Sequence, residues 1–501
     1  MSDCLPKADS EAAERPRLSL GPLVDILLPT LVWLVHTVVF VRGGGATRAN
    51  DGLWQLLPRE ALLEQPFKSL FLLHAQPPVL NTLFALLLHI ERGFGVPLQQ
   101  SATLVFHGVA LLSCILWFGL ARRLTGHVSV AFLVLVLMVT NPAFPLFQGE
   151  FFYPHLLLLF AAVYFWAAYL WACRPTRWRL AFLLAGLGLM VQTRSLWHPV
   201  TVILPLACVA WATLDRREGW RRVARRVGAG LMVFGLLVGP WMVKNAVIFG
   251  SPGFSSWLGY NLEAKPEGAP AWAGRTRISE FIHTGQYDEA LVAAYYTPER
   301  LEWLQHQAVT GPVDKLAPIQ HEMLKRNMNH LAIPALNRQD VRDLVDHYRS
   351  NPDLYLQRCV SHLVKFDLPC YAQPWGRPLC EPFFPFGTPW RDVHAIVYHG
   401  RWFGHIFRAV CHCPSFFLMA LLPLALFTGL AGFVLRPADP RWFTAGLMAL
   451  CYLWLLAMAV FVDGFESCRM RWHLEPAYLI LLAMVLVPTC KKLRNWLRPR
   501  L

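Results

Sequence analysis

Long apolar runs separated by short polar segments dominate this chain. Ten of the runs approach the roughly 20 residues that a helix needs to cross a bilayer. We therefore predict ten membrane-spanning helices, of which the fifth and sixth are short. They are Leu20–Val41, Ala102–Ala121, Val128–Leu146, Phe152–Trp171, Leu180–Gln192, Val200–Leu214, Val227–Phe249, Pro414–Leu435, Phe443–Val462 and Ala477–Val487.

An eleventh apolar segment, Pro77–Ile90, is too short to span the bilayer. An apolar segment of about 14 residues is more typical of a helix that lies on the membrane surface or re-enters it. The choice matters, because every later loop would change sides if this segment crossed the membrane.

The distribution of Lys and Arg decides between these two topologies. With Pro77–Ile90 on the surface, the predicted cytoplasmic segments carry 21 Lys and Arg residues and the three short outer loops carry 3. Cytoplasmic loops are enriched in Lys and Arg, so we predict that both termini are cytoplasmic. Because the net charge of +14 lies in these short clusters, no nucleic-acid partner is expected.

The pattern predicts an all-α polytopic membrane protein with three parts. Residues 1–249 form a transmembrane module that includes a first outer loop at 42–100, residues 250–412 form an extracytoplasmic loop domain, and residues 413–501 form the last transmembrane helices and a basic cytoplasmic tail. Only 16% of residues are charged, against about 25% in soluble domains, which supports a membrane location.

Asp51 follows the first predicted span and is the first candidate for chemistry. A carboxylate at the outer membrane surface can act as a general base towards an acceptor hydroxyl or amine. The simpler interpretation is a solvated loop residue that caps a short helix.

Glu150 stands at the start of the fourth span, five residues before His155. The pair can bind a substrate or a metal, but an acid in the first turn of a helix also favours the helix dipole. Two ligands are weak support for a metal site.

The last outer loop is dense in charge and contains Glu466, Arg469, Arg471 and Glu475. The planar guanidinium groups of outward arginines match the oxygens of a phosphate. Pairing of the arginines with the two acids is the competing interpretation. Two further cations, Arg194 and Lys244, stand at outward span ends, where a long cationic side chain often only reaches for the interface.

Four stretches together resemble a known family of enzymes. They are Asp51; His74-Ala-Gln-Pro-Pro-Val-Leu80; Pro240-Trp-Met-Val-Lys-Asn245 with the later Gly259-Tyr-Asn-Leu262; and Glu466-Ser-Cys-Arg-Met-Arg471 before Pro476. In this order they resemble the GT-C glycosyltransferases, specifically the polyprenyl- or dolichyl-phosphate-sugar-dependent enzymes related to protein O-mannosyltransferases and lipid A aminoarabinose transferases. Glu150 also matches a recurrent acid of that family. The sequence departs from the family pattern in having Asn50 and Gly52 beside Asp51 and Lys244 where an Arg is usual.

The resemblance implies a membrane glycosyltransferase with a GT-C-like bundle and interfacial helices. Asp51 would be the catalytic base, and the substrate and its phosphate would be bound by Arg469, Arg471, Lys244, Arg194, Glu150, His74 and Glu466. A lipid-linked sugar is the implied donor, and a protein, lipid or glycan the acceptor, with inversion at the anomeric carbon. A divalent metal is compatible with the family, and no other cofactor is implied.

Two other functions are compatible with the sequence. A transporter or flippase of lipid-linked or anionic solutes would place charges along a path at the bilayer midplane, and Asp25 inside the first span is one such charge. A non-catalytic membrane scaffold would require neither Asp51 nor the arginines. The membrane itself is either a bacterial inner membrane or the endoplasmic reticulum.

Overall fold

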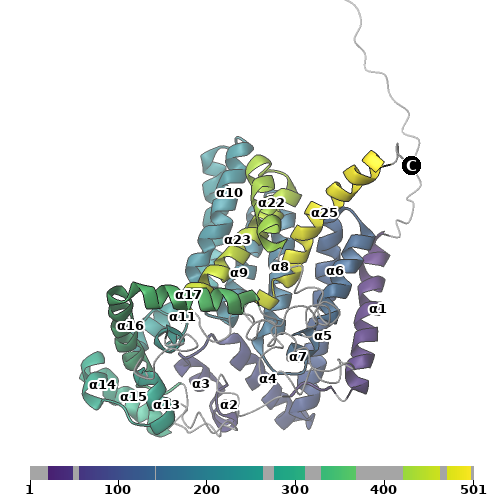
Figure 1. Cartoon of the computed structure of the whole chain (residues 1–501). Coiled ribbons are helices and arrows are strands. Elements are labelled where there is room, and N and C mark those ends of the chain that lie inside the picture. Colours follow the sequence, from purple (N-terminus) through teal and green to yellow (C-terminus); the bar gives the residue numbers. More distant parts are fainter. Residues whose placement is uncertain are drawn as a thin grey trace, which may run out of the picture.

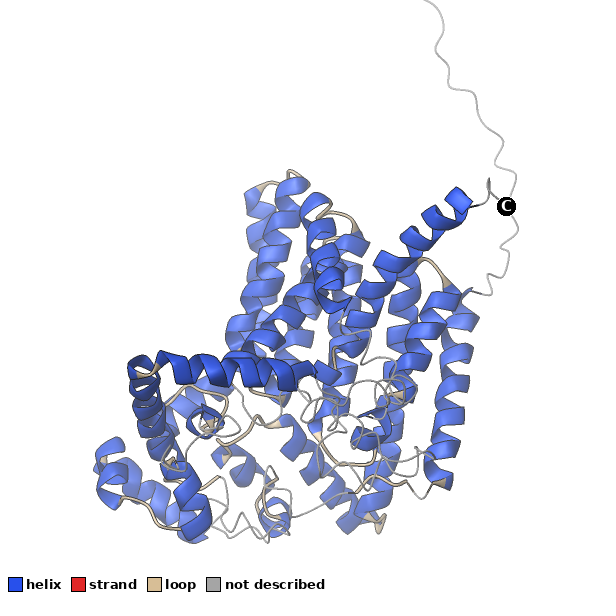
Figure 2. Cartoon of the chain, in the orientation of Figure 1, coloured by secondary structure: helices blue, strands red, loops and turns tan. Residues whose placement is uncertain are grey.

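The protein is all-helical over the residues that the computed structural model describes (Figures 1 and 2). These are residues 21–43, 45–48, 56–141, 143–262, 276–310, 329–367, 421–462 and 471–497. Within them, the β-pairing consists of one isolated parallel bridge between Arg48 and Glu150.

Five helices among the described residues are long and apolar enough to cross a membrane. They are α1 (Gly21–Arg42), α5 (Leu98–Thr125), α8 (Tyr153–Cys173), α11 (Trp220–Phe249) and α23 (Pro440–Phe461). The chain is therefore a multi-pass integral membrane protein, as its hydropathy predicts.

Five further helices account for the remaining predicted spans. They are α6 (Val128–Thr140), α9 (Arg177–Thr193), α10 (Ile203–Asp215) with the preceding 3-10 turn η1 (Pro199–Val202), α22 (Leu422–Leu435) and α25 (Glu475–Leu497). Each of the ten predicted segments thus overlaps a helix, although ten crossings remain a prediction.

Two helix boundaries differ from the predicted ones for clear physical reasons. The predicted span Val128–Leu146 is divided, because α6 ends at Thr140 and a separate α7 (Ala143–Gln148) follows. Asn141 lies between them and stands before a proline in the sequence, and a residue before proline disfavours helical backbone. The seventh helix, α11, begins at Trp220, seven residues before the predicted Val227, because its arginine-rich start is also helical.

The spans pack closely, with α9 against both α8 and α11 and with α5 against α1, α6 and α8. Gly186 on α9 allows a close approach of α9 and α8, since a Cβ there would lie 3.2 Å from the Cα of Tyr164 on α8. Asp25, which the sequence left unexplained inside the first span, is paired with Arg122 near the end of α5 at 2.6 Å.

The longer segments between the spans lie at one end of the bundle (Figure 1). In that view α1 begins and α25 ends at the upper end, whereas α2 (Arg59–Glu64), α3 (Pro66–Leu72) and α4 (Val79–Phe94) lie at the lower end. The predicted surface segment Pro77–Ile90 coincides with α4, whose 16 residues extend about 24 Å, less than the bilayer core of roughly 30 Å. Its location on the membrane surface remains a prediction.

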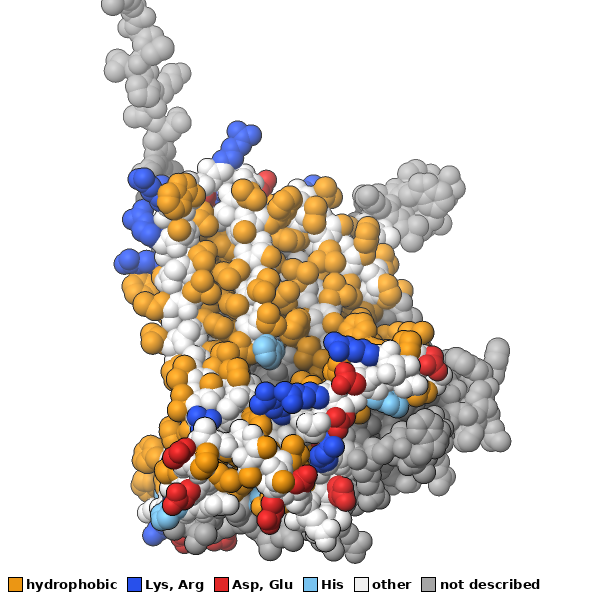
Figure 3. All heavy atoms as spheres, turned by 90° about the vertical axis from the view of Figure 1, so that its left-hand side faces the viewer, with side chains coloured by type: hydrophobic (Ala, Val, Ile, Leu, Met, Phe, Trp, Pro, Cys, Tyr) orange, Lys and Arg blue, Asp and Glu red, His pale blue; other side chains and the backbone are white. Residues whose placement is uncertain are grey.

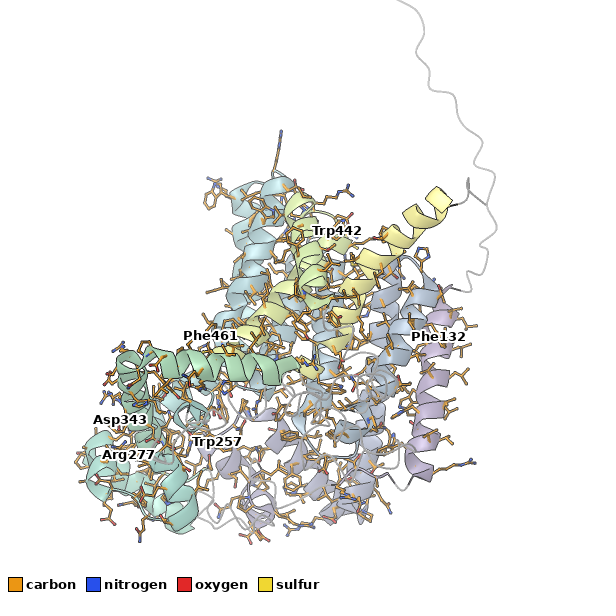
Figure 4. All side chains as sticks on the ribbon, in the orientation of Figure 1. Phe132, Trp257, Arg277, Asp343, Trp442 and Phe461 are labelled. Atoms are coloured by element: carbon orange, nitrogen blue, oxygen red, sulfur yellow. The ribbon has the colours of Figure 1, made fainter. Side chains whose placement is uncertain are left out.

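A smaller helical unit joins this lower end. It consists of α12 (Leu258–Leu262), α13 (Arg277–Thr284), α14 (Glu289–Tyr295), α15 (Pro298–Thr310) and α16 (Ile333–Ser350). These helices share a core that includes Ile278, Phe281 and Leu336. Arg277 on α13 forms an ion pair with Asp343 on α16, and the two are labelled in Figure 4.

Helix α17 (Pro352–Asp367) crosses the front of the molecule nearly at right angles to the spans (Figure 1). Its Arg358 is completely buried and donates hydrogen bonds to the backbone oxygens of Phe461 and Val462 at the end of α23, and to that of Asn261. This one side chain thereby ties the smaller helical unit, through Asn261 of α12, to the end of α23. Phe461 is labelled in Figure 4.

Candidate functional site

The segment after α1 and the segment between α7 and α8 run side by side. Thr47 Oγ1 donates to the carbonyl oxygen of Gln148 over 2.8 Å. The N–H of Arg48 donates to the carbonyl of Gly149, and the N–H of Phe151 donates to the carbonyl of Arg48. These bonds form the parallel bridge and hold Glu150 beside the chain that leads to Asp51. Asp51 itself lies outside the described residues.

Gln148 is held by two histidines from two different spans. Its Oε1 accepts a hydrogen bond from His36 Nε2 of α1 over 2.9 Å, and its Nε2 donates to His107 Nδ1 of α5 over 2.6 Å. All three side chains are buried. The sequence analysis did not select them, although polar residues inside apolar runs are candidates for function by default.

The environment of Glu150 changes its acid–base behaviour. Burial raises the pKa of this carboxyl to about 7, and the nearby Arg48 opposes the shift. A carboxyl that is half ionised near neutral pH can accept or release a proton. Glu150 precedes α8 and is the bridge partner of Arg48, so the interpretation as a first-turn acid of this helix is wrong.

Arg194, at the end of α9, is buried and lies over the ring of Tyr153 from α8, 4.4 Å from its centroid. The nearby Trp197 donates from Nε1 to Nε2 of His473 over 3.1 Å. Burial lowers the pKa of His473 to about 3, and the charge of Arg194 adds to the shift. His473 is therefore neutral, and Arg194 is the cation of this group.

Arg471 is buried at the start of the last described segment. The next residue, Trp472, packs against the ring of His155, with centroids 5.2 Å apart. His155 is fully buried, and neither of its ring nitrogens has a hydrogen-bond partner among the described residues. In the same region Asn141 Nδ2 donates to Glu475 Oε2 over 2.7 Å.

The structure thus places Arg194 beside Tyr153 and His473, and places Trp472, the neighbour of Arg471, against His155. Glu150 precedes the helix that contains Tyr153 and His155. Glu466 and Arg469, the other two candidates of this loop, lie outside the described residues. Sequence analysis missed Trp197 and His473, whose link joins segments 276 residues apart.

His74 and Lys244 form a second group. His74 Nδ1 shares a hydrogen bond with Ser256 Oγ over 2.8 Å, and its Nε2 bonds the carbonyl of Asn329 over 3.0 Å. Burial, with the charge of Lys244 beside it, lowers the pKa of His74 to about 3. His74 is therefore neutral, and its two hydrogen bonds fasten the loop before α4 to Ser256 and to Asn329, which precedes α16 of the smaller helical unit.

Lys244 is buried and does not reach for solvent. Its Nζ donates to the carbonyl oxygen of Leu73 and lies 3.5 Å from the centroid of the Trp241 ring. The ammonium group therefore has a structural partner and a cation–π contact.

Metal-binding side chains do not gather within the described residues, where no group of three or more His, Cys, Asp or Glu is placed to hold an ion. Glu150 contributes one carboxylate, and an ion would need further ligands. Asp51 and Glu466 lie outside the described residues.

Two solved structures are similar to the chain over nearly its whole length. Archaeal oligosaccharyltransferase AglB from Archaeoglobus fulgidus, in complex with an inhibitory peptide and a dolichol-phosphate, matches 96% of this chain and 52% of its own, with 11% identity and a TM-score of 0.48. ArnT from Cupriavidus metallidurans, bound to undecaprenyl phosphate, matches 94% and 79%, with 16% identity and a TM-score of 0.35.

Both are GT-C glycosyltransferases, the family that the sequence motifs resemble. The chain spans about half the length of AglB. No protein-family model matches the sequence, and no curated protein sequence matches it.

Proposed function

We propose that the protein is a membrane glycosyltransferase that uses a polyprenyl- or dolichyl-phosphate-linked sugar. The observation that carries the proposal is that two arginines, Arg194 and Arg471, are buried at the ends of the spans, with Arg194 over the ring of Tyr153 and Arg471 next to Trp472, which packs against His155. The planar guanidinium group of an arginine matches the oxygens of a phosphate. A lipid phosphate at the end of a span would lie at the depth of these two side chains.

The proposed reaction is a single displacement at the anomeric carbon. The acceptor oxygen or nitrogen forms a bond to this carbon while the bond from the carbon to the lipid phosphate oxygen breaks. The proton of the acceptor passes to the carboxylate of Asp51, and the electron pair of the broken bond stays on the lipid phosphate. Arg194 and Arg471, with Arg469, stabilise that charge as it develops, and the sugar inverts.

Asp51 and Glu150 are proposed to act from the same place. In sequence, Asp51 follows Arg48 by three residues, a stretch that reaches at most about 11 Å, and Arg48 bridges Glu150. Glu150 and Glu466 are proposed to bind the sugar or the acceptor, and His74 and Lys244 to support the wall of the site. The site is proposed to face the extracytoplasmic or luminal side, with ten spans and both termini cytoplasmic.

Transfer of radiolabelled sugar tests the proposal directly. The full chain, reconstituted in liposomes, would be offered polyprenyl-phosphate sugars and a panel of acceptors. We expect transfer by the wild type, a loss of about 10²-fold or more in Asp51→Asn, and a similar loss in Arg471→Gln. Arg123→Gln is the matched control, because Arg123 is an exposed arginine at the opposite end of α5.

The outcomes separate the alternatives. Undiminished transfer by Asp51→Asn would remove Asp51 from the catalytic role, while undiminished transfer by Arg471→Gln would remove the phosphate site. An absence of transfer with every donor, together with flux of a lipid-linked or anionic solute, would establish a transporter or flippase. An absence of both, with wild-type behaviour of the two variants in partner binding, would establish a scaffold.

A further inference from the structure

The turn between α10 and α11 contains an open pocket that the proposed reaction does not use. Its volume is about 510 Å³, and its walls include Arg217, Glu218, Trp220, Arg221, Arg222 and Arg225. The turn lies at the opposite end of α11 from Lys244. The pocket is thus separate from the proposed catalytic site.

Two of the six arginines in this segment are already used inside the protein. Arg216 donates to the carbonyl oxygens of Ala172 and Ala438 over 2.7 and 2.9 Å, which fastens the turn to the end of α8 and to the loop between α22 and α23. Arg226 forms an ion pair with Glu218. The acid in the pocket wall is therefore neutralised by a residue outside the wall.

The other four arginines remain available to a ligand. Arg217, Arg221, Arg222 and Arg225 are exposed, and none forms an ion pair with a described residue. Arg221, Arg222 and Arg225 follow one another at helical spacing, so that their guanidinium groups share one side of the first turns of α11. Four cations around a single pocket attract an anion strongly.

The position of these arginines in the helix strengthens the requirement for an anion. The N-terminus of a helix carries partial positive charge, which disfavours Arg in the first turn. The residue before the helix, Gly219, has no side chain with which to cap the first N–H groups. An anion in the pocket would offset both the arginine charges and this end of the helix.

The surroundings identify the source of the anion. Trp220 in the pocket wall is 74% exposed, Leu214 near the end of α10 is 70% exposed, and Trp178 in the first turn of α9 is 68% exposed. Exposed Trp at a span end is typical of the membrane interface. Figure 3 shows apolar side chains covering the bundle, with Lys and Arg along its upper edge. We propose that the pocket binds the phosphate headgroup of an anionic phospholipid in the leaflet on this side, with the acyl chains against the exposed apolar surface.

The test is lipid retention by the full chain in detergent, measured by native mass spectrometry with phosphatidylglycerol or phosphatidylcholine. We expect the wild type to retain phosphatidylglycerol about tenfold or more over phosphatidylcholine, since each arginine near an anionic headgroup contributes substantially. R221Q/R222Q/R225Q should lose this preference. The control R174Q/R177Q/R436Q removes three exposed arginines from the same end of the bundle and should keep it.

Each contrary result is distinguishable. Equal losses in the two triple variants would assign the preference to general surface charge and overturn the pocket. An unchanged preference in R221Q/R222Q/R225Q would do the same. Displacement of phosphatidylglycerol by millimolar inorganic phosphate would make the pocket a site for a free anion and would overturn the proposal of a lipid ligand. If the triple variant does not fold, the preference for phosphatidylglycerol must still fall severalfold in the single variant R225Q. The preference of the wild type must also fall with added salt, which screens the arginines.

Discussion

Asp25 Oδ1 accepts a hydrogen bond from Arg122 NH1 over 2.6 Å, which joins the start of α1 to the end of α5. The pair explains an acid inside the first apolar run without a solute path at the bilayer midplane. The side chains of Asp25 and Arg122 are 21% and 27% exposed. The contribution of the pair to stability is therefore expected to lie between that of an exposed ion pair and that of a buried one.

Removal of either partner should therefore destabilise the protein. We expect Asp25→Asn and Arg122→Gln each to lower the free energy of unfolding by about 1–2 kcal/mol, with a double variant that costs less than the sum of the two. The measurement is unfolding of the full chain in detergent. Arg123→Gln, next to Arg122 and exposed, should change it by less than about 0.5 kcal/mol. Strict additivity would contradict the pairing.

Two threonines near the end of α1 allow a matched comparison. Thr47 is buried and donates to the carbonyl of Gln148, whereas Thr37 Oγ1 has no partner among the described residues. We expect Thr47→Val to cost about 1–3 kcal/mol, because a buried carbonyl loses its donor, and Thr37→Val to be neutral or stabilising. Because Thr47 positions the segment before Asp51, its loss should also lower the rate of transfer. Equal stability of the two variants would argue against the docking of this loop.

The raised pKa of Glu150 predicts how stability depends on pH. At a pH below the ordinary pKa of 4.5, the carboxyl is protonated in the folded and unfolded states alike, so it does not lower the free energy of unfolding. As pH rises towards the folded-state value of about 7, ionisation of the buried group is disfavoured and stability falls, by at most about 3 kcal/mol.

Glu150→Gln should remove this dependence between pH 4.5 and 7. Unfolding midpoints measured across that range should decline in the wild type and stay nearly level in the variant. Glu64→Gln, at an exposed acid on α2, should behave like the wild type. A decline that persists unchanged in Glu150→Gln would assign it to another group.

The predicted sidedness can be tested with one native and one engineered thiol. Cys173 is exposed at the end of α8, in a loop that we predict to be cytoplasmic, and Gln286 is exposed between α13 and α14. In chains whose other cysteines are replaced by serine, an impermeant thiol reagent added outside should label Gln286→Cys and not Cys173. Labelling of Cys173 and not of Gln286→Cys from outside would mean that Pro77–Ile90 crosses the membrane, because both sites would then change sides.

The helices were predictable because apolar length is a local property of the sequence, and each predicted span overlaps a helix. Their ends were less predictable where local signals conflict, as at Asn141, or where a charged stretch continues a helix, as at the start of α11. The site depended on distant contacts. His36 meets Gln148 across 112 residues, and no local pattern in a single sequence encodes such a distance. Only their polar character within apolar runs could have marked them.

The contacts of Arg358 have a consequence for biosynthesis. The backbone oxygens of Phe461 and Val462 that receive its guanidinium belong to the end of α23, about a hundred residues later in the chain. When the ribosome has completed α17, those acceptors have not yet been made. The smaller helical unit therefore reaches its final docked position only after α23 has been synthesised, so that its docking waits for a span that is made later.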